Sequence, residues 1–459
     1  MTEFDLSATR RIHVVGVGGP GMSALAIVLA QMGHRVSGSD VRETAVLDKV
    51  RAAGVAVTIG HDPGLVSGCD AVTYSTAIPL DNVEVRAARE LGLRLMHRSG
   101  MLAAVCARSE ALGVAGTHGK TTTSSLLRAA LSSLSPSFVI GGDVIDLGTG
   151  AAWTGGRHIV VEADESDGTY RELPLRGAIV TNIDVDHLDH FGTFADLQRD
   201  FAAFMAGVDG PVAVGWDDGI ARGVASVADP RRLVTYGADP SCTVRWTDVD
   251  ARGDAMTFTV HGGFGRRSVR LPLRGIHNVA NACGALALAT EIGVDIDEAI
   301  RGIESFGGVG RRFDVVGRAD GATFVDDYAH LPREIAAVLA AARAGGEWKR
   351  VVAVFQPNRY NRMATMADEY GDAFVDADVV VLTDIYSSGT APIPGVTGHL
   401  VVDAVRRNHP AARVEWVADR ADLARAVSTL VEPGDVCISM GCGDIEFLPR
   451  EILGVRGAL

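Results

Sequence analysis

Long apolar runs, paired cysteines and an apolar leader are all missing from this sequence of 459 residues. No stretch reaches the roughly 20 uninterrupted apolar residues that cross a bilayer. The polar start of the chain, residues 1–11, predicts no secretory signal. Six cysteines occur without a C-x-x-C spacing, namely Cys69, Cys106, Cys242, Cys283, Cys437 and Cys442. Scattered cysteines of this kind are typical of reduced thiols, so we expect a cytoplasmic protein.

Basic charge is also scarce in this chain. Lys and Arg number 43 against 57 Asp and Glu, which leaves a formal net charge of −14, and no strongly basic run occurs. A negative chain without basic clusters argues against nucleic acid and against an anionic membrane surface as main partners. Small anionic molecules are not excluded, because their binding sites are local. We therefore expect small-molecule substrates and a monomer or a homodimer.

The order of the apolar segments predicts an α/β protein with doubly wound sheets. Short apolar runs alternate with helical stretches, and many runs end in Gly, Asp or Asn. Buried parallel strands have this pattern when their carboxyl ends form a site. The expected strands include 12–17, 71–74, 159–161, 178–181, 351–355, 379–383 and 436–440.

Length and pattern together predict three domains. A chain of this size corresponds to about three domains of ordinary length. One boundary is expected within 107–112, and the other after 312–316, where Gly317 precedes a turn. The predicted domains are therefore 1–108, 109–316 and 317–459. Within 234–273 short polar and β-branched residues alternate, which predicts antiparallel strands inserted in the central domain.

A glycine-rich loop between an expected strand and a helix expected over 124–131 is the clearest functional motif. It comprises Gly116, Thr117, His118, Gly119, Lys120, Thr121 and Thr122. Backbone N–H groups and a helix N-terminus converge at such a loop and suit a phosphate chain. The spacing is Gly-x-x-Gly-Lys-Thr, because Val114 stands where the standard P-loop has its first glycine. We expect ATP here, with Lys120 on the β- and γ-phosphates and the Thr121 hydroxyl on Mg²⁺; a plain glycine turn is the alternative.

A second glycine loop follows the first expected strand. Its residues are Gly16, Gly18, Gly19, Gly21, Met22 and Ser23, and Asp40 comes nineteen residues after Gly21. Gly-x-Gly-x-x-Gly with a later acid matches a dinucleotide fingerprint, so an NAD(P)-dependent dehydrogenase is an alternative function. The same loop suits any diphosphate, including that of a UDP-sugar. His97 and Arg98, expected on the last loop of the first domain, are either anion-binding residues or a solvated basic pair.

Two clusters of acids follow neighbouring expected strands. The first contains Glu162, Asp164, Glu165 and Asp167, and the second contains Asp184, Asp186, His187 and Asp189. Crowded carboxylates repel one another unless a cation lies among them. We therefore predict that Thr121, Glu162 and His187 hold Mg²⁺, which would bridge phosphate oxygens. A solvated acidic loop is the alternative.

Other polar segments are candidate contacts of the nucleotide and of a second substrate. His277, Asn278 and Asn281 open an Ala-rich helix and suit an adenine edge, although Asn278 also suits a helix cap. Arg312, next to Arg311, is a candidate for stabilising charge on the γ-phosphate. Strand exits at 325–332, 355–362 and 384–389 are rich in polar residues. There Arg359 or Arg362 can bind the carboxylate of an amino acid, and His330 can take a proton from an attacking amine.

These segments resemble the Mur ligases over essentially the whole chain, and most of all the branch that adds alanine. The matching segments are 16–23, 116–123, 162–167, 181–189, 277–282, 311–313, 326–332, 355–362 and 441–445. The first glycine loop and the Asp-Asp-Tyr-Ala-His exit at 326–330 are specific to that branch. The resemblance implies a Rossmann-like UDP-sugar domain, a central P-loop ATPase-like α/β domain, and a Rossmann-like domain that binds the amino acid.

The resemblance also implies a reaction of peptidoglycan precursor synthesis. The lactyl carboxylate of UDP-N-acetylmuramate attacks the γ-phosphate of ATP, and the amine of L-alanine then attacks the acyl phosphate and releases phosphate. Carried onto this chain, MgATP is held by Lys120, Thr121, Glu162 and His187. The nucleotide contacts Asn278, Asn281, Arg312 and Asp327, and the alanine contacts Tyr328, His330 and Arg362. The UDP-sugar set comprises the first glycine loop with Asp40 and Arg98. The predicted catalytic residues are Lys120, His330 and Arg312.

The chain departs from the family pattern in the third domain. The family usually has His, Thr, His and Glu where this chain has Leu331, Arg333, Asn358 and Thr390. Two alternatives to L-alanine as the acceptor therefore stay open: a recycled tripeptide and another amino acid. Related ligases with a carbamylated lysine place it shortly after the metal histidine, and 191–204 holds no lysine, in agreement with the alanine-adding branch. A degenerate nucleotide-binding regulator is disfavoured, because the predicted phosphate and metal residues are all present.

Overall fold

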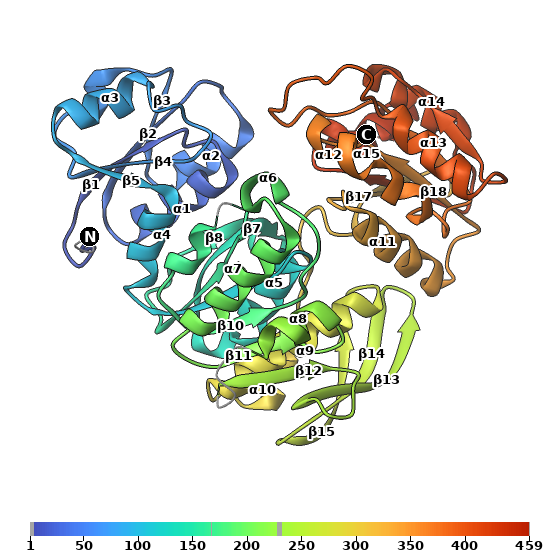
Figure 1. Cartoon of the computed structure of the whole chain (residues 1–459), viewed down its shortest axis with the longest axis horizontal. Helices are drawn as coiled ribbons and strands as arrows, with labels where there is room; N and C mark the ends of the chain where they lie inside the picture. Colours follow the sequence, from blue (N-terminus) through green and yellow to red (C-terminus); the bar gives the residue numbers. More distant parts are fainter. Residues whose placement is uncertain (1–3, 167, 227–231, 459) are drawn as a thin grey trace. The chain divides into compact units, whose positions relative to one another are not determined.

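The computed structural model describes residues 4–166, 168–226 and 232–458, and in them three β-sheets with their helices (Figure 1). The chain divides into two compact units. The first is Met1–Thr247, Thr259–Val269 and Ala280–Gly307; the second is Asp248–Phe258, Arg270–Val279 and Gly308–Leu459. No helix in the described ranges is both long enough and apolar enough to pass through a membrane. Asp167, part of the first predicted acidic cluster, lies outside the described residues.

The first sheet is parallel, with the strand order β3-β2-β1-β4-β5. Its strands are β1 (Arg11–Val15), β2 (Arg35–Asp40), β3 (Ala56–Ile59), β4 (Ala71–Tyr74) and β5 (Arg94–His97). Its helices are α1 (Pro20–Gln31), α2 (Ala45–Ala52), α3 (Val83–Glu90) and α4 (Arg98–Cys106). The order reverses between β1 and β4. The glycine loop after β1 therefore lies at a topological switch point, where such sheets bind ligands.

The second sheet has the order β15-β14-β13-β12-β11-β10-β6-β9-β7-β8. Its strands are β6 (Glu110–Ala115), β7 (Ser137–Val144), β8 (Thr149–Ala152), β9 (His158–Glu162), β10 (Leu175–Val180), β11 (Val212–Gly215), β12 (Leu233–Gly237), β13 (Val244–Arg252), β14 (Ala255–Gly262) and β15 (Gly265–Leu271). The helices of this part are α5 (Lys120–Ala130), α6 (Leu188–Phe191), α7 (Phe194–Gly207), α8 (Gly219–Ala225), α9 (Ile276–Glu291) and α10 (Ile296–Glu304). β6 pairs in parallel with β9 on one side and β10 on the other. Both acidic loops therefore leave the sheet at the same edge as the predicted ATP loop.

The segment 234–273 is only partly antiparallel. β12 pairs in parallel with β11, beginning with Leu233 opposite Val212, and so extends the main sheet. β13, β14 and β15 are neighbours in the sheet and are joined by the two-residue connections 253–254 and 263–264. Connections this short join antiparallel strands. The prediction therefore agrees with the structure for β13–β15 and is wrong for β12, because alternation along a strand does not record which partner it pairs with.

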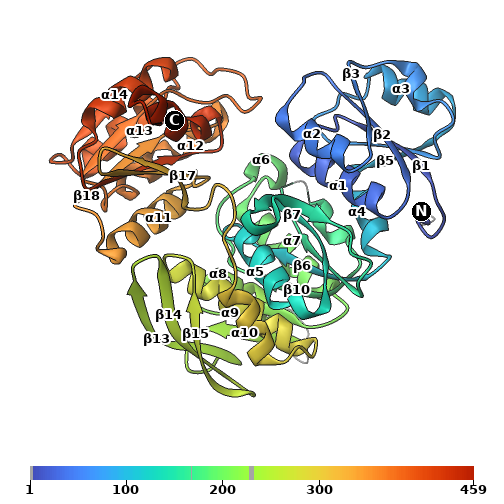
Figure 2. The ribbon, with the colours of Figure 1, turned by 180° about the vertical axis from the view of Figure 1, so that it is seen from behind.

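The third sheet has the order β16-β17-β21-β18-β19-β20, and both Figure 1 and Figure 2 show its helices packed around it. Its strands are β16 (Asp314–Ala319), β17 (Ala322–Asp327), β18 (Arg350–Phe355), β19 (Val379–Leu382), β20 (Val414–Trp416) and β21 (Asp435–Met440). The helices are α11 (Pro332–Gly345), α12 (Tyr360–Met366), α13 (His399–Asn408), α14 (Leu423–Leu430) and α15 (Leu448–Val455). β16 and β17 are antiparallel, and the remaining pairs are parallel. The polar exits after β18 and β19 are therefore neighbours, and β21 lies between them and the exit after β17.

One cluster of buried apolar side chains contains residues of both the first and the second sheet. It includes Leu25 and Val28 of α1 together with Ala151 of β8. Gln31 Oε1 also accepts the Trp153 N–H at 2.7 Å. The third sheet has clusters of its own. The parallel-rich sheets confirm the predicted α/β class, whereas the domain boundaries at 108 and 316 stay a prediction.

Candidate functional site

The glycine-rich loop after β6 runs directly into α5, which begins at Lys120 rather than at 124 as expected. Two glycines determine its shape. Gly116 has a φ of 125°, and a Cβ there would lie 2.2 Å from Thr181 Oγ1. Gly119 has a φ of 79°, and a Cβ there would lie 2.8 Å from Asn281 Oδ1. Only glycine fits these two positions, and the loop places the N-terminus of an eleven-residue helix where an anion can bind.

The segment after β10 holds this loop in place. Asn182 Oδ1 accepts the His118 N–H at 2.8 Å, and Asn182 Nδ2 donates to the His118 carbonyl at 3.1 Å. The Thr117 N–H donates to the Asn182 carbonyl at 3.1 Å, and Thr117 Oγ1 accepts the Asp184 N–H at 2.9 Å. His118 Nε2 lies 3.1 Å from Asp184 Oδ2. No sequence motif marks this role of Asn182, because its partner lies 64 residues earlier in the chain.

Lys120 is surrounded by oxygen atoms. Its Nζ lies 2.8 Å from the Gly116 carbonyl oxygen and 2.9 Å from Glu165 Oε1, and its side chain is only 12% exposed. Burial alone would lower the pKa of Lys120, but the charges of Glu165, Asp164 and Glu162 outweigh it and raise that pKa. Lys120 is therefore a fixed positive charge at the start of α5.

The predicted magnesium ligands fall into two groups. Thr121 Oγ1 donates to Glu162 Oε1 at 3.1 Å, and Glu162 Oε2 accepts the Gly141 N–H at 2.8 Å. His187 instead groups with Asp164 and Glu165, and one potential ligand atom of each lies within 4.8 Å of the others. These two acids belong to the acidic cluster expected from the sequence, but they are not among the predicted ligands.

The second group has one feature that favours a bound cation. Glu165 Oε2 is buried and, within the described part of the chain, has no hydrogen-bond partner. Burial raises the pKa of Glu165 to about 7, although Lys120 opposes the shift. Hydroxyl and carboxylate oxygens suit Mg²⁺, which completes its coordination with phosphate oxygens and water. The residues present therefore fit this ion.

The predicted nucleotide contacts at the start of α9 are partly occupied by the protein. Asn278 Nδ2 donates to the Arg274 carbonyl at 2.8 Å and so ties the first turn of α9 to the preceding chain. A Cβ on Gly275 would lie 2.5 Å from the His277 ring, so His277 packs against this glycine. Burial, and then the charge of Arg312, lower the pKa of His277 to about 4. Contact of Asn278 with an adenine stays a prediction.

Two arginines of the second unit flank Tyr328. The guanidinium carbons of Arg311 and Arg312 lie 4.9 Å and 5.2 Å from the centre of its ring. Arg311 also pairs with Asp326, Nε to Oδ2 at 3.0 Å, and with Glu446, Nη1 to Oε2 at 2.8 Å. Burial, opposed by Arg311, raises the pKa of Asp326 to about 6. Since two acids pair with Arg311, Arg312 stays the candidate for phosphate charge.

Asp327 holds backbone in position. Its Oδ2 accepts the Phe313 N–H and its Oδ1 accepts the Ala329 N–H, both at 2.7 Å. The residue is 4% exposed, and burial raises its pKa even though Arg312 opposes the shift. Asp327 therefore organises the loop that carries Arg312, and its contact with a nucleotide stays a prediction.

His330 lies beside the same tyrosine. Its Nδ1 lies 3.1 Å from the Tyr328 carbonyl oxygen and 3.2 Å from Glu334 Oε2. The two rings meet edge to face, with their centres 5.4 Å apart. Arg312, Tyr328 and His330, which sequence analysis derives from separate motifs, therefore lie together.

The remaining amino-acid candidates lie at the exit of β18. Arg362 Nη1 donates to Asn358 Oδ1 at 2.9 Å, and Arg362 is 8% exposed. The Arg359 N–H donates to the Tyr386 carbonyl at 2.9 Å, at a φ of 63° for Arg359. Burial raises the pKa of the Cys442 thiol, and the charges of Arg362 and Arg359 oppose this shift. Both arginines therefore lie near the loop after β21.

The departures from the family pattern have identifiable surroundings. Asn358 is the partner of Arg362 described above. Thr390 Oγ1 accepts the Tyr360 N–H at 2.9 Å and donates to the Ser387 carbonyl at 2.6 Å. Leu331 is a core residue with 3% exposure, whereas Arg333 is exposed. Two of the four departures thus help to shape the polar exits themselves.

The N-terminal glycine loop closes onto the end of β2. The Gly16 and Val17 N–H groups both donate to the Ser39 carbonyl, at 2.8 Å and 2.9 Å. The Gly18 N–H donates to Asp40 Oδ2 at 2.8 Å, and the other oxygen of this carboxylate accepts a backbone N–H two residues later. Asp40 therefore shapes the loop, and its contact with a ribose or a UDP-sugar stays a prediction.

Arg98 reaches the same loop from α4. A Cβ on Gly21 would lie 2.7 Å from Arg98 Nη1. The loop expected at His97 and Arg98 does not exist, because β5 ends at His97 and α4 begins at Arg98. His97 Nδ1 lies 2.9 Å from Ser99 Oγ in the first turn of α4. The structure thus brings Arg98 to the glycine loop and gives His97 a local role at a helix start.

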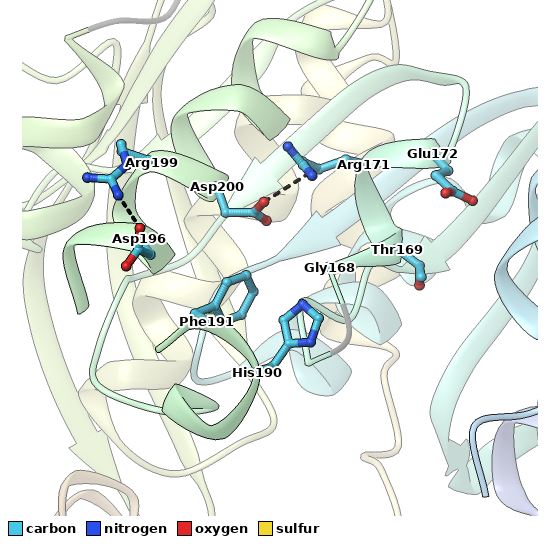
Figure 3. A pocket seen from close by; sticks show the side chains of 9 residues that line it. All are labelled: Gly168, Thr169, Arg171, Glu172, His190, Phe191, Asp196, Arg199 and Asp200. Carbon is cyan, nitrogen blue, oxygen red and sulfur yellow. Dashed lines mark hydrogen bonds and ion pairs between the residues drawn. The ribbon is translucent and has the colours of Figure 1, made fainter. Parts of the chain in front are cut away.

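A cavity that sequence analysis does not predict lies beside the segments that carry the acidic clusters (Figure 3). Its volume is about 560 Å³. Its walls come from the 3₁₀-helix Thr169–Glu172, from α6 and from α7, and are formed by Gly168, Thr169, Arg171, Glu172, His190, Phe191, Asp196, Arg199 and Asp200. Arg171 Nε lies 3.0 Å from Asp200 Oδ1, and Arg199 pairs with Asp196. The cavity is polar and lies close in the chain to Glu165 and His187.

Three family models match consecutive parts of the chain. Residues 11–110 match the model described as Mur ligase family, catalytic domain. Residues 114–289 match the Mur ligase middle domain, and residues 311–443 match the Mur ligase, glutamate ligase domain.

Similar proteins and similar solved structures are also named as ligases. A UDP-N-acetylmuramate–L-alanine ligase of Bradyrhizobium sp. (strain ORS 278) is 43% identical, over 96% of this chain and 97% of its own. The crystal structure of the UDP-N-acetylmuramate-alanine ligase of Thermotoga maritima has a TM-score of 0.82 at 27% identity, covering 98% of this chain and 99% of its own. A murein peptide ligase of Psychrobacter arcticus shares the fold, with a TM-score of 0.70 at 23% identity. The similarity covers 98% of this chain and 99% of that protein. These proteins are named as ligases and not as dehydrogenases.

Proposed function

The chain belongs to the Mur ligase family, and on that premise we propose that it joins L-alanine to the lactyl carboxylate of UDP-N-acetylmuramate, using ATP. The observation that carries this choice is the nearly full-length similarity to relatives named for that reaction. The helix N-terminus at Lys120 supports it, because a buried, permanently charged lysine at a glycine loop suits the phosphates of ATP.

The first step activates the carboxylate. The lactyl carboxylate oxygen attacks the γ-phosphorus of ATP, the bond to the β-phosphate oxygen breaks, and ADP leaves. Lys120 and the N–H groups at the start of α5 stabilise the negative charge that builds up on the phosphates. Arg312 adds a second positive charge. Mg²⁺, held by Thr121, Glu162 and His187, with Asp164 and Glu165 close to the histidine, would neutralise phosphate charge and orient the γ-phosphate.

The second step forms the amide bond. The amine of L-alanine attacks the carbonyl carbon of the acyl phosphate. The C–O bond to the phosphate breaks, and inorganic phosphate leaves with the two electrons of that bond. His330 takes the proton that the amine loses. Its Nδ1 is held by the Tyr328 carbonyl and Glu334, so the ring orientation is set by the protein. Arg362, or Arg359 beside it, binds the carboxylate of the amino acid.

The UDP-sugar binds at the switch point of the first sheet. The glycine loop and the start of α1 offer backbone N–H groups to its diphosphate, and Arg98 lies against Gly21 to add positive charge. Binding of the UDP-sugar requires the loop shape that hydrogen bonds to Ser39 and Asp40 determine. The expected compartment is the cytoplasm, and a monomer or a homodimer stays a prediction.

Phosphate release from ATP tests the proposed function. Purified protein with Mg²⁺, ATP, UDP-N-acetylmuramate and L-alanine should release phosphate, and omission of the sugar nucleotide or of the amino acid should stop it. The tripeptide L-alanyl-γ-D-glutamyl-diaminopimelate replaces L-alanine in a parallel reaction, because the departures at Leu331, Arg333, Asn358 and Thr390 all lie in the acceptor domain. Release that ignores the sugar nucleotide would refute the ligase function, and a preference for the tripeptide would refute the choice of acceptor.

A further inference from the structure

A buried carboxylate lies under the N-terminal glycine loop. Glu84, in the first turn of α3, is completely buried, and so is His13 of β1. Glu84 Oε2 lies 2.6 Å from Ser39 Oγ, 3.3 Å from His13 Nε2 and 3.3 Å from His61 Nδ1. Glu84 Oε1 accepts the Asp62 N–H at 3.1 Å. One carboxylate thus ties together β1, β2, α3 and the segment after β3.

Glu84 is charged in spite of its burial. Burial would raise its pKa, but the hydrogen bonds from His13, Ser39 and the Asp62 N–H outweigh this and lower the pKa. A buried charge is a poor source of stability, since apolar residues of similar size often serve as well. Its presence here calls for a role other than packing.

The network leads directly to the loop that receives the UDP-sugar. Ser39 Oγ donates to Glu84, while the Ser39 carbonyl accepts the N–H groups of Gly16 and Val17. The next residue, Asp40, accepts the Gly18 N–H. Three consecutive amide groups of the loop are therefore held by the end of β2, and Glu84 holds the end of β2.

We propose that Glu84 is a positioning residue for the UDP-sugar, acting through Ser39 to keep the glycine loop in the shape that accepts a diphosphate. This inference rests on the proposed function. Glu84 itself is too deeply buried to touch the ligand, so its effect is on binding of the sugar nucleotide and not on transfer of the phosphoryl group.

The variants Glu84→Gln and Ser39→Ala test the inference. It predicts that they change the KM for the sugar nucleotide and leave kcat nearly unchanged. Each variant removes a charged hydrogen bond of the network, so KM for UDP-N-acetylmuramate should rise about tenfold or more. The value of kcat and the KM for ATP should change less than about twofold. Ser39→Ala decides the matter if the buried Glu84→Gln change prevents folding.

Asn82→Ala is the matched control. Asn82 Oδ1 caps α3 by accepting the Glu84 and Val85 N–H groups at 2.9 Å and 3.3 Å, so its loss loosens the same helix and leaves the carboxylate in place. An unchanged KM in this control supports the inference. An equal rise in the control, or an unchanged KM in an active Ser39→Ala variant, overturns it. Wild-type protein without turnover overturns the proposed function instead, so the two failures are distinct.

Discussion

Lys120 is held in place by the protein's own oxygen atoms. Its Nζ contacts the Gly116 and Thr117 carbonyls and Glu165. A side chain fixed in this way loses little conformational freedom when phosphate binds, and its positive charge is available without rearrangement. At the scale of single residues, this preorganisation is what the proposed chemistry depends on most.

Lys120→Ala should therefore lower kcat for alanine-dependent phosphate release by at least about 100-fold, the usual effect of losing one preorganised charge-stabilising group. The measurement is steady-state phosphate release with saturating substrates. Because Glu165 loses its partner, circular dichroism must show that the variant is folded. Undiminished release by a folded variant would show that ATP does not bind at this loop.

His277 makes stability depend on pH. Its pKa is lowered to about 4 in the folded chain, against about 6.5 in the unfolded chain, so the unfolded state binds more protons between these values. Stability is therefore fully present above pH 6.5 and is lost as the pH falls toward 4. Because the residue as a whole is only partly buried, we expect a loss of about 1 to 2 kcal/mol between pH 7 and pH 5.

Urea unfolding of the wild type and of His277→Gln at the two pH values measures this effect. The glutamine variant cannot titrate, so its loss of stability between pH 7 and pH 5 should be smaller than that of the wild type. Equal losses in both proteins would contradict the assignment.

Residues with a local signature could be found from the sequence, and residues with distant partners could not. Gly116, Gly119 and Lys120 stand in one short motif whose chemistry can be recognised. Asn182 and Glu84 act on backbone that is distant in the chain, and neither has a neighbouring signal. The sequence predicts that Asp40 and Asp327 contact ligands, which stays a prediction, and does not reveal that their carboxylates also accept backbone N–H groups.

At the scale of elements, the site depends on strand order in the central sheet. β6 leads into the predicted ATP loop, and its neighbours β9 and β10 lead into the two acidic loops. The loop after β10 contains His187 and also Asn182, whose side chain makes two hydrogen bonds with the backbone of His118. A change in this segment should therefore affect ATP binding without any direct contact with the nucleotide.

Asn182→Ala should raise the KM for ATP about tenfold, because it removes two hydrogen bonds that fix the His118 backbone. Binding of UDP-N-acetylmuramate, measured by calorimetry without ATP, should be unchanged. Asn408→Ala, at the end of α13, removes another side-chain amide bond, to Asp372, and serves as the control. A KM for ATP that stays at the wild-type value in Asn182→Ala would show that these hydrogen bonds do not affect ATP binding.

Strands were easier to predict than helix starts or pairing. Continuous apolar runs identified β4 with its observed bounds and β9, β18 and β21 to within a residue or two, because buried parallel strands have few polar residues. The start of α5 was placed four residues late, since Lys120 and the threonines that follow it do not resemble an apolar helix. β12 was predicted antiparallel because its sequence does not record that β11 is its neighbour.

At the scale of the whole molecule, the residues proposed for the reaction are distributed over both compact units. Lys120, Glu162 and His187 belong to the first, whereas Arg312, Asp327 and His330 belong to the second. Sequence motifs predict both sets, and the roles of these residues stay a prediction. The proposed reaction uses residues of both sets.

Transfer of oxygen from the sugar nucleotide to phosphate tests the central claim most directly. UDP-N-acetylmuramate labelled with ¹⁸O in its lactyl carboxylate is incubated with Mg²⁺, ATP, L-alanine and the protein, and the phosphate is analysed by mass spectrometry. If the carboxylate is activated as an acyl phosphate, each phosphate released carries one oxygen atom from the carboxylate. Unlabelled phosphate, formed at the same rate as the amide, would contradict that route.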